Sequence, residues 1–160
     1  MKTALEGGFI DEITFRSLKP TGSTTPQLYG LPKTHKAGIP LRPILSMTNS
    51  AQHKLAKWLA KLLKPVRDNV AKYNLKDSFD LAKSLQDMNI GQQVMGSLDI
   101  ESLFTNVPLR ETIAYVLQCI EELKINVGLP ASELERLLLI CTENISFEFQ
   151  SKTYRQSPDT

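Results

Sequence analysis

The chain has 160 residues, of which 41% are hydrophobic and 22% charged, with nine prolines, eight glycines and two cysteines. This composition is typical of one compact soluble domain and excludes collagen-like, low-complexity and disulfide-scaffold proteins. No stretch approaches the roughly 18 consecutive apolar residues of a membrane span, and residues 1–10 lack the apolar region of a secretory signal. We therefore expect an intracellular protein without a membrane partner.

Charge is distributed unevenly along the chain, although the net charge is only +2. Residues 13–67 contain ten basic residues and no acidic one, which leaves the remainder with a formal charge of −8. Such asymmetry favours a polyanionic partner, because only the phosphate-facing part of a nucleic-acid-binding protein needs positive charge. For the lysines between residues 54 and 64, a solvated helix face is an equally good interpretation.

Residues 1–25 show little hydrophobic periodicity and contain Pro20, Gly22 and a Ser/Thr cluster, which predicts an N-terminal arm or loop. Between residues 27 and 47, two short apolar runs flank a basic turn that contains a glycine, the pattern of a β-hairpin. Three prolines in this segment cannot donate hydrogen bonds to a strand ladder. We therefore expect edge-like strands that face solvent or a ligand.

Several later segments have helical patterns. Ser50 is expected to cap a helix whose apolar residues, from Leu55 to Val66, pack against a sheet, with lysines on the opposite face. A second helix is predicted from Asp77 to Met88, with its apolar face turned inward, and a third from Arg110 to Leu123.

A fourth helix is predicted after Ser132, which forms a capping box with Glu135. Cys119 and Cys141 lie inside apolar helical patterns, and we expect them to be buried thiols. Alternating residues from 145 to 149 predict a half-buried strand that turns at 150–152 and returns through Tyr154.

Residues 93–100 predict a buried strand that ends with the carboxylate of Asp99. A strand that ends in Asp, followed by the aromatic Phe104 and a proline-led helix, is typical of the way a palm-type polymerase positions a metal-binding carboxylate. Taken alone, Asp99 is equally consistent with a helix cap or a turn cap.

Lys33 and Arg42 occupy the two strands of the predicted basic hairpin. Lysine supplies a point charge and arginine a planar fork for pairs of phosphate oxygens, so this pair favours phosphate binding. A generic basic turn is the alternative, and it suits Lys36 better than Arg42, which lies between apolar neighbours.

With these segments, the chain resembles the reverse transcriptase of Penelope-like retroelements, a group related to telomerase. The similar segments occur in the family's order and extend over almost the whole chain from about Ser17. They are YGLPKTHK (29–36), PLRPILS (40–46), DIESLFTNVP (99–108), ETI (111–113), FEF (147–149) and YRQ (154–156). The resemblance implies an α+β fold in which residues 26–160 form a partial reverse-transcriptase domain, with a fingers hairpin at 26–48 and the early palm at 93–160.

The resemblance also implies roles for individual residues. Asp99 would be the first catalytic metal ligand, with the main-chain carbonyl of Ile100 as a second contact, and Mg²⁺ would be the cofactor. The partners would be an RNA template, a DNA primer and deoxynucleoside triphosphates, and the location would be nuclear.

Further roles concern the incoming nucleotide. Lys33 and Arg42 would hold its triphosphate, and Phe104 would be the wall under the sugar that rejects a 2′-hydroxyl. Gln156 matches the start of the next motif, which packs against template and nucleotide, although Ser157 follows where the family usually has a nearby glycine.

The paired-aspartate hairpin that supplies the remaining metal carboxylates is not found in these 160 residues. We therefore expect a fragment of an RNA-directed DNA polymerase that is inactive by itself. Two alternatives remain, a non-catalytic nucleic-acid-binding module that uses only the basic half, and a decayed remnant of an element.

Overall fold

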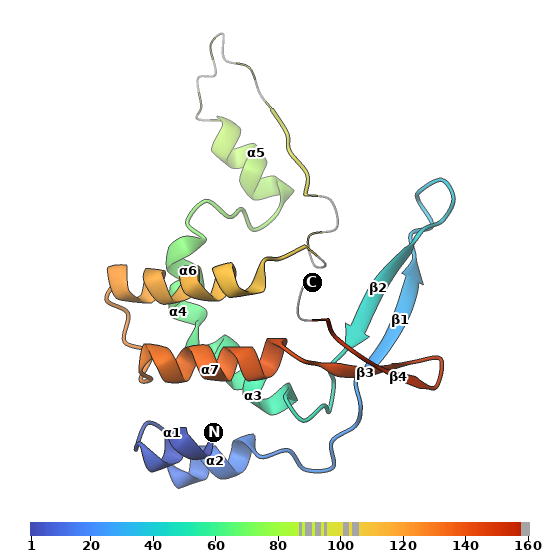
Figure 1. Cartoon of the computed structure of the whole chain (residues 1–160). Helices are drawn as coiled ribbons and strands as arrows, with labels where there is room; N and C mark the ends of the chain where they lie inside the picture. The colour runs from blue at the N-terminus through green and yellow to red at the C-terminus, as the bar shows by residue number, and fades with distance from the viewer. Residues whose placement is uncertain are drawn as a thin grey trace.

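The computed structural model describes residues 1–86, 88, 91, 94, 96–100, 103 and 106–157 (Figure 1). In this part of the chain, seven helices and one four-stranded sheet form an α+β architecture. The helices are α1 (Lys2–Glu6), α2 (Glu12–Leu18), α3 (His53–Leu62), α4 (Lys64–Val70), α5 (Ser78–Gln86), α6 (Leu109–Glu122) and α7 (Ala131–Thr142). The strands are β1 (Gln27–Pro32), β2 (Leu41–Ser46), β3 (Ser146–Phe149) and β4 (Lys152–Arg155).

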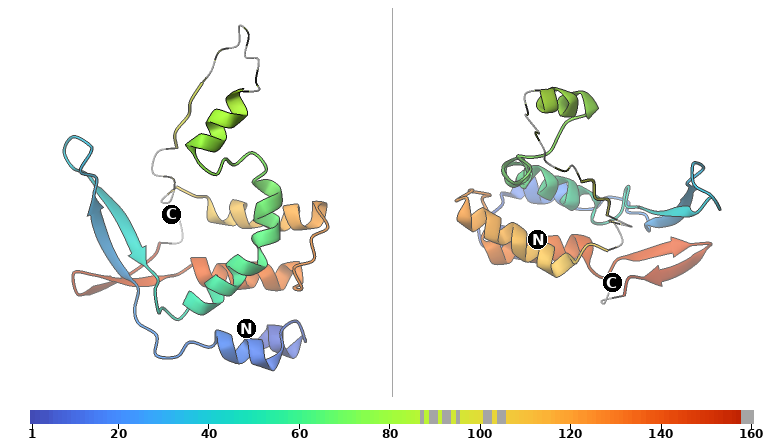
Figure 2. Two further views of the ribbon diagram at one scale, coloured as in Figure 1. Left: turned by 180° about the vertical axis from the view of Figure 1, so that it is seen from behind. Right: turned by 90° about the horizontal axis from the view of Figure 1, so that it is seen from above.

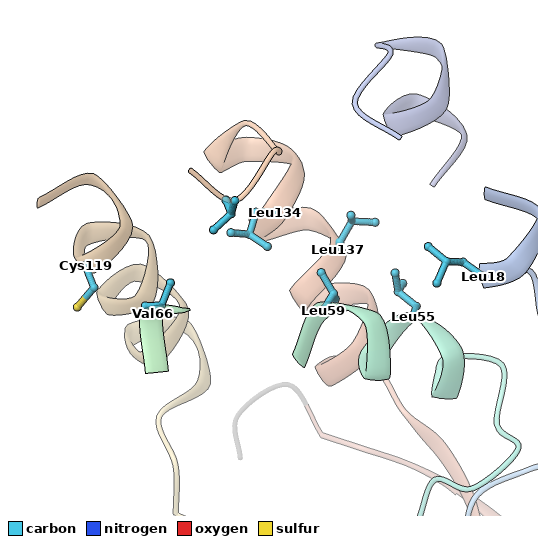
Figure 3. Packing of buried hydrophobic residues seen from close by; sticks show 8 residues of the cluster. Leu18, Leu55, Leu59, Val66, Cys119, Leu134 and Leu137 are labelled. Atoms are coloured by element: carbon cyan, nitrogen blue, oxygen red, sulfur yellow. The ribbon is translucent and has the colours of Figure 1, made fainter. Parts of the chain in front are cut away.

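The main hydrophobic core lies between helices. Helix α3 packs against α7 and α2, and α6 packs against α7 and α4. Leu134 and Leu137 of α7 are 0% and 1% exposed, and Leu137 lies opposite Leu55 and Leu59 of α3 (Figure 3). The core consists of Leu18, Leu55, Leu59, Val66, Cys119, Val127, Leu134 and Leu137.

The prediction that the helix after Ser50 packs against a sheet is therefore wrong. The α7 leucines supply the apolar surface that buries α3, whereas the two hairpins project away from the helices on one side of the molecule (Figure 2). Pro65 has no N–H to donate to the carbonyl of Lys61, and it falls where α3 ends and α4 begins.

Neither predicted serine cap is present. Helix α3 begins at His53, and Ser50 is buried with its main-chain carbonyl accepting a hydrogen bond from the His53 N–H at 3.1 Å. Helix α7 begins at Ala131 after Pro130, so Ser132 is already inside the helix and its side chain caps nothing. In both places the observed start differs from the predicted one by a few residues.

The N-terminal segment is helical, so the expectation of an arm or loop is wrong for α1 and α2. Asp11 caps α2 by accepting a hydrogen bond from the Thr14 N–H at 2.6 Å. Ala4, Ile10 and Phe15 form a second small core beside these helices. The two helices have five and seven residues, which is too short for a clear helical period in the sequence.

Both predicted hairpins are confirmed, and they share one sheet in the order β2-β1-β3-β4. Strands β1 and β2 are antiparallel from the pair Gln27 and Ser46 to the pair Pro32 and Leu41, and β3 and β4 are also antiparallel. Strand β1 pairs in parallel with β3 only at Gln27 and Glu148. The hairpins therefore touch at one corner and diverge (Figure 1).

The predicted helix after Asp77 is present, but its predicted inward face is not buried. The Asp77 carboxylate accepts hydrogen bonds from the N–H groups of Phe79 and Asp80, at 3.0 and 2.9 Å, which fixes the start of α5. No residue of α5 is buried, and the Phe79 side chain is 84% exposed.

The predicted buried strand over residues 93–100 is also not found. Among its described residues, 94 and 96–100, none belongs to a strand, and Val94 and Leu98 are almost completely exposed. A strand needs a neighbour to satisfy its N–H and C=O groups, and the four strands among the described residues pair with one another.

Burial of the cysteines is confirmed for Cys119, and Cys141 is half-buried. Desolvation raises the pKa of the Cys141 thiol from about 9 to about 11. As the pH rises through this window, the unfolded chain loses its thiol proton first, so folding becomes less favourable.

We expect the free energy of unfolding to fall more steeply between pH 9 and 11 in the wild type than in Cys141→Ala. Denaturant titrations at several pH values measure this difference, and parallel curves would contradict it.

Candidate nucleic-acid interface

The β1/β2 hairpin brings Lys33 and Arg42 to the same face. Arg42 is paired with Leu31, and side chains of a strand alternate between faces, so Lys33, two residues after Leu31, lies on the Arg42 face. The Lys33 N–H donates to the Pro40 carbonyl at 2.9 Å, which continues the register one step beyond the strand. Diagonal neighbours of this kind are about 7 to 8 Å apart, so both cations can reach phosphates of one triphosphate.

Both cations are available to an external anion. Arg42 is exposed and Lys33 is half-buried, and neither forms an ion pair within the described part of the chain. The hairpin lies inside the acid-free segment 13–67, so no carboxylate of its own competes for them.

Sequence reasoning did not single out Tyr29, which shares this face with the two cations. Tyr29 pairs with Ile44, is two residues before Leu31, and is 46% exposed. The alternation of residues 29 and 31 in β1, continued by residue 33 just after the strand, is the sequence signal that would have placed Tyr29 on this face. The ring lies diagonally across the hairpin from Arg42 and about 13 Å along the strand from Lys33. An exposed aromatic ring on the same face as two cations suits a nucleotide, whose base stacks and whose phosphates carry charge.

Lys36 lies at the tip of the hairpin, apart from this pair. The turn is closed by a hydrogen bond from the Lys36 N–H to the Lys33 carbonyl at 3.0 Å and by another from the Ile39 N–H to the Lys36 carbonyl at 3.1 Å. Gly38 and Ile39 have positive φ angles of 73° and 42° there. The Lys36 side chain is exposed.

Asp99 and Ile100 lie in an irregular segment between α5 and α6, outside the four-stranded sheet. Asp99 is exposed, and Ile100 is 66% exposed. No group of three His, Cys, Asp or Glu side chains that could hold a metal occurs among the described residues. The carboxylate of Asp99 has the right chemistry for Mg²⁺, but one carboxylate does not make a two-metal site.

Gln156 continues the β3/β4 hairpin by one step. Its N–H donates to the Ile145 carbonyl at 2.9 Å, and its side-chain oxygen accepts a hydrogen bond from the Ile145 N–H at 3.4 Å. Gln156 therefore belongs to the same sheet as Lys33 and Arg42 but to the other hairpin. Phe104 lies outside the described residues.

Many of the other basic residues between 13 and 67 already have partners. The Arg16 guanidinium pairs with Glu12 at 2.8 Å, and Lys54 donates to the Lys19 carbonyl at 3.2 Å and the Thr21 hydroxyl at 3.1 Å. On α4, Lys64 and Arg67 both bind Asp68, and their hydrogen bonds lower the pKa of that carboxyl.

Comparison of the chain with protein-family models, with curated proteins and with solved structures finds no match to any of them. In the described ranges, no helix has both the length and the apolar character needed to cross a bilayer. The functional assignment therefore depends on the residue pattern and on the geometry described above.

Proposed function

We propose that the chain forms the fingers and the first part of the palm of a retroelement RNA-directed DNA polymerase, similar to the Penelope-like group, acting in the nucleus. This enzyme would add deoxynucleotides to a primer paired with an RNA template. The observation that supports the proposal best is the position of Lys33 and Arg42 on one face of an acid-free hairpin. The ordered set of similar segments between residues 29 and 156 supports it independently.

In this proposal Arg42 binds two phosphate oxygens with its planar fork, and Lys33 adds a second positive charge. Phe104 lies under the sugar, and Gln156 packs near the template and nucleotide. Asp99, with the Ile100 carbonyl, is one ligand of the catalytic Mg²⁺. Two-metal phosphoryl transfer requires more carboxylates than Asp99 supplies, and in the proposal they come from other residues of the polymerase.

Substitution of Arg42 tests the phosphate role. In a polymerase that contains these residues together with the remaining catalytic carboxylates, Arg42→Ala is expected to raise the KM for deoxynucleotides about 10- to 100-fold. This is the range for loss of hydrogen bonds to a charged group, about 1.5 to 3 kcal/mol. Steady-state kinetics of primer extension at varied nucleotide concentration measures the effect.

Lys36→Ala is the matched control, because Lys36 is a cation of the same hairpin that lies at its exposed tip. We expect its KM to stay within about twofold of the wild type, since water replaces an exposed ammonium group at little cost. Arg42→Lys keeps the charge but loses the fork, so its KM should fall between those of the wild type and Arg42→Ala. Equal KM values for the Arg42 and Lys36 alanine variants would refute the proposed role of Arg42.

A further inference from the structure

The outer face of α3 carries two lysines that the proposed nucleotide site does not use. The opposite face of this helix is buried in the core, because Leu55 and Leu59 are 3% and 2% exposed and pack toward α7 (Figure 3). Lys57 and Lys61 are exposed and are one helical turn apart. Their positions differ by about 6 Å along the helix axis.

Three of the four acidic side chains on the helices packed against α3 are held in ion pairs of their own. These pairs are Glu12 with Arg16 on α2, Asp68 with Lys64 and Arg67 on α4, and Glu133 with Arg136 on α7. The fourth, Glu135 of α7, is exposed and forms no ion pair with either lysine in the described part of the chain. Within the described residues, Lys57 and Lys61 have no ion pair. Lys54, on the same helix, is instead bound to the loop that follows α2.

We propose that Lys57 and Lys61 bind the sugar-phosphate backbone of an RNA strand, forming a contact surface separate from the β1/β2 hairpin. Phosphates follow one another at about 3.4 Å per strand, so two lysines about 6 Å apart can contact neighbouring or alternate phosphates. The positive charge of this face indicates a polyanionic partner. That this polyanion is RNA rests on the proposed polymerase function.

A membrane surface fits this helix poorly. A basic amphipathic helix binds a bilayer by inserting its apolar face among the lipids. In this protein the apolar face of α3 is already buried against α7 and α2, and only the polar face remains. Charge attraction to phosphates does not need an apolar face, so a nucleic-acid backbone is the better occupant.

Salt-dependent binding of the 160-residue chain to a labelled single-stranded RNA oligonucleotide tests the proposal. Each phosphate contact contributes about 0.7 to the slope of log K against log salt for a single strand. The double variant Lys57→Ala, Lys61→Ala should therefore reduce the magnitude of the slope by about 1.4, which corresponds to roughly 25-fold weaker binding at 0.1 M salt.

The matched control is the double variant Lys2→Ala, Lys83→Ala, which removes two exposed lysines from helices α1 and α5. Its slope should equal that of the wild type. Alanine favours the helix at all four positions, so circular dichroism should show the fold retained in both variants.

Equal slopes for the two double variants would overturn the proposal, and so would a wild type that does not bind RNA. The proposal would also be overturned, in favour of a membrane surface, if the Lys57→Ala, Lys61→Ala variant lost binding to vesicles of anionic phospholipid but bound RNA like the wild type. Failure of the polymerase proposal would be seen elsewhere, as an unchanged nucleotide KM in Arg42→Ala, so the two failures can be told apart.

Discussion

Replacing Leu134 with alanine is expected to lower the free energy of unfolding by about 2 to 5 kcal/mol, the range for deletion of a buried leucine side chain. Leu134 is completely buried where α7 meets the rest of the helical core. The substitution loses apolar burial and leaves a cavity that the close-packed surroundings fill only in part. Because a domain of this size is stable by about 5 to 15 kcal/mol, this is a large fraction of the total.

Ile140→Ala is the control on the same helix, since the Ile140 side chain is 41% exposed. Its loss should cost about 1 kcal/mol or less, because water already reaches much of the side chain and alanine favours the helix. Urea unfolding followed by circular dichroism gives both values. Similar losses for the two variants would mean that α7 is not held by the packing described.

The two hairpins could be predicted from the sequence because their signals are local. Residues 145–149 alternate strictly, and the turn that follows uses Gln150 and Ser151 with φ angles of 49° and 61°. In the β1/β2 hairpin, the alternation of side chains between the two faces of a strand also predicts that Lys33 and Arg42 share a face, once the register of the hairpin is known. The bond between Gln156 and Ile145 depends on the register of the second hairpin, which the sequence does not specify.

Burial was predicted less well than secondary structure, because burial depends on partners distant in the sequence. The period of α5 is helical, yet nothing in the described structure covers Phe79. The apolar run that contains Leu98 was predicted to be a buried strand, but composition alone does not supply the neighbouring strand that it needs. Helix α3 was predicted correctly as a helix, but the sequence did not show that its partner is α7.

Asp99→Asn is expected to reduce DNA synthesis at least about 100-fold while leaving RNA affinity nearly unchanged. Asparagine keeps the size and hydrogen-bonding capacity of the side chain but removes the charge that, in the proposed site, would attract Mg²⁺. Electrostatic stabilisation by catalytic metals is worth several kcal/mol. Asp99 is exposed, so the substitution should not disturb the helical core. A surface that only binds nucleic acid would not need this carboxylate.

The most direct test of the polymerase assignment is primer extension on an RNA template by a polymerase that contains these residues and the remaining catalytic carboxylates. Glu135→Gln, which neutralises an exposed carboxylate on α7, is the control and should extend the primer like the wild type. RNA affinity is measured in parallel on the same preparations. The account predicts that Asp99→Asn loses extension and keeps RNA binding, and undiminished extension by this variant would contradict it.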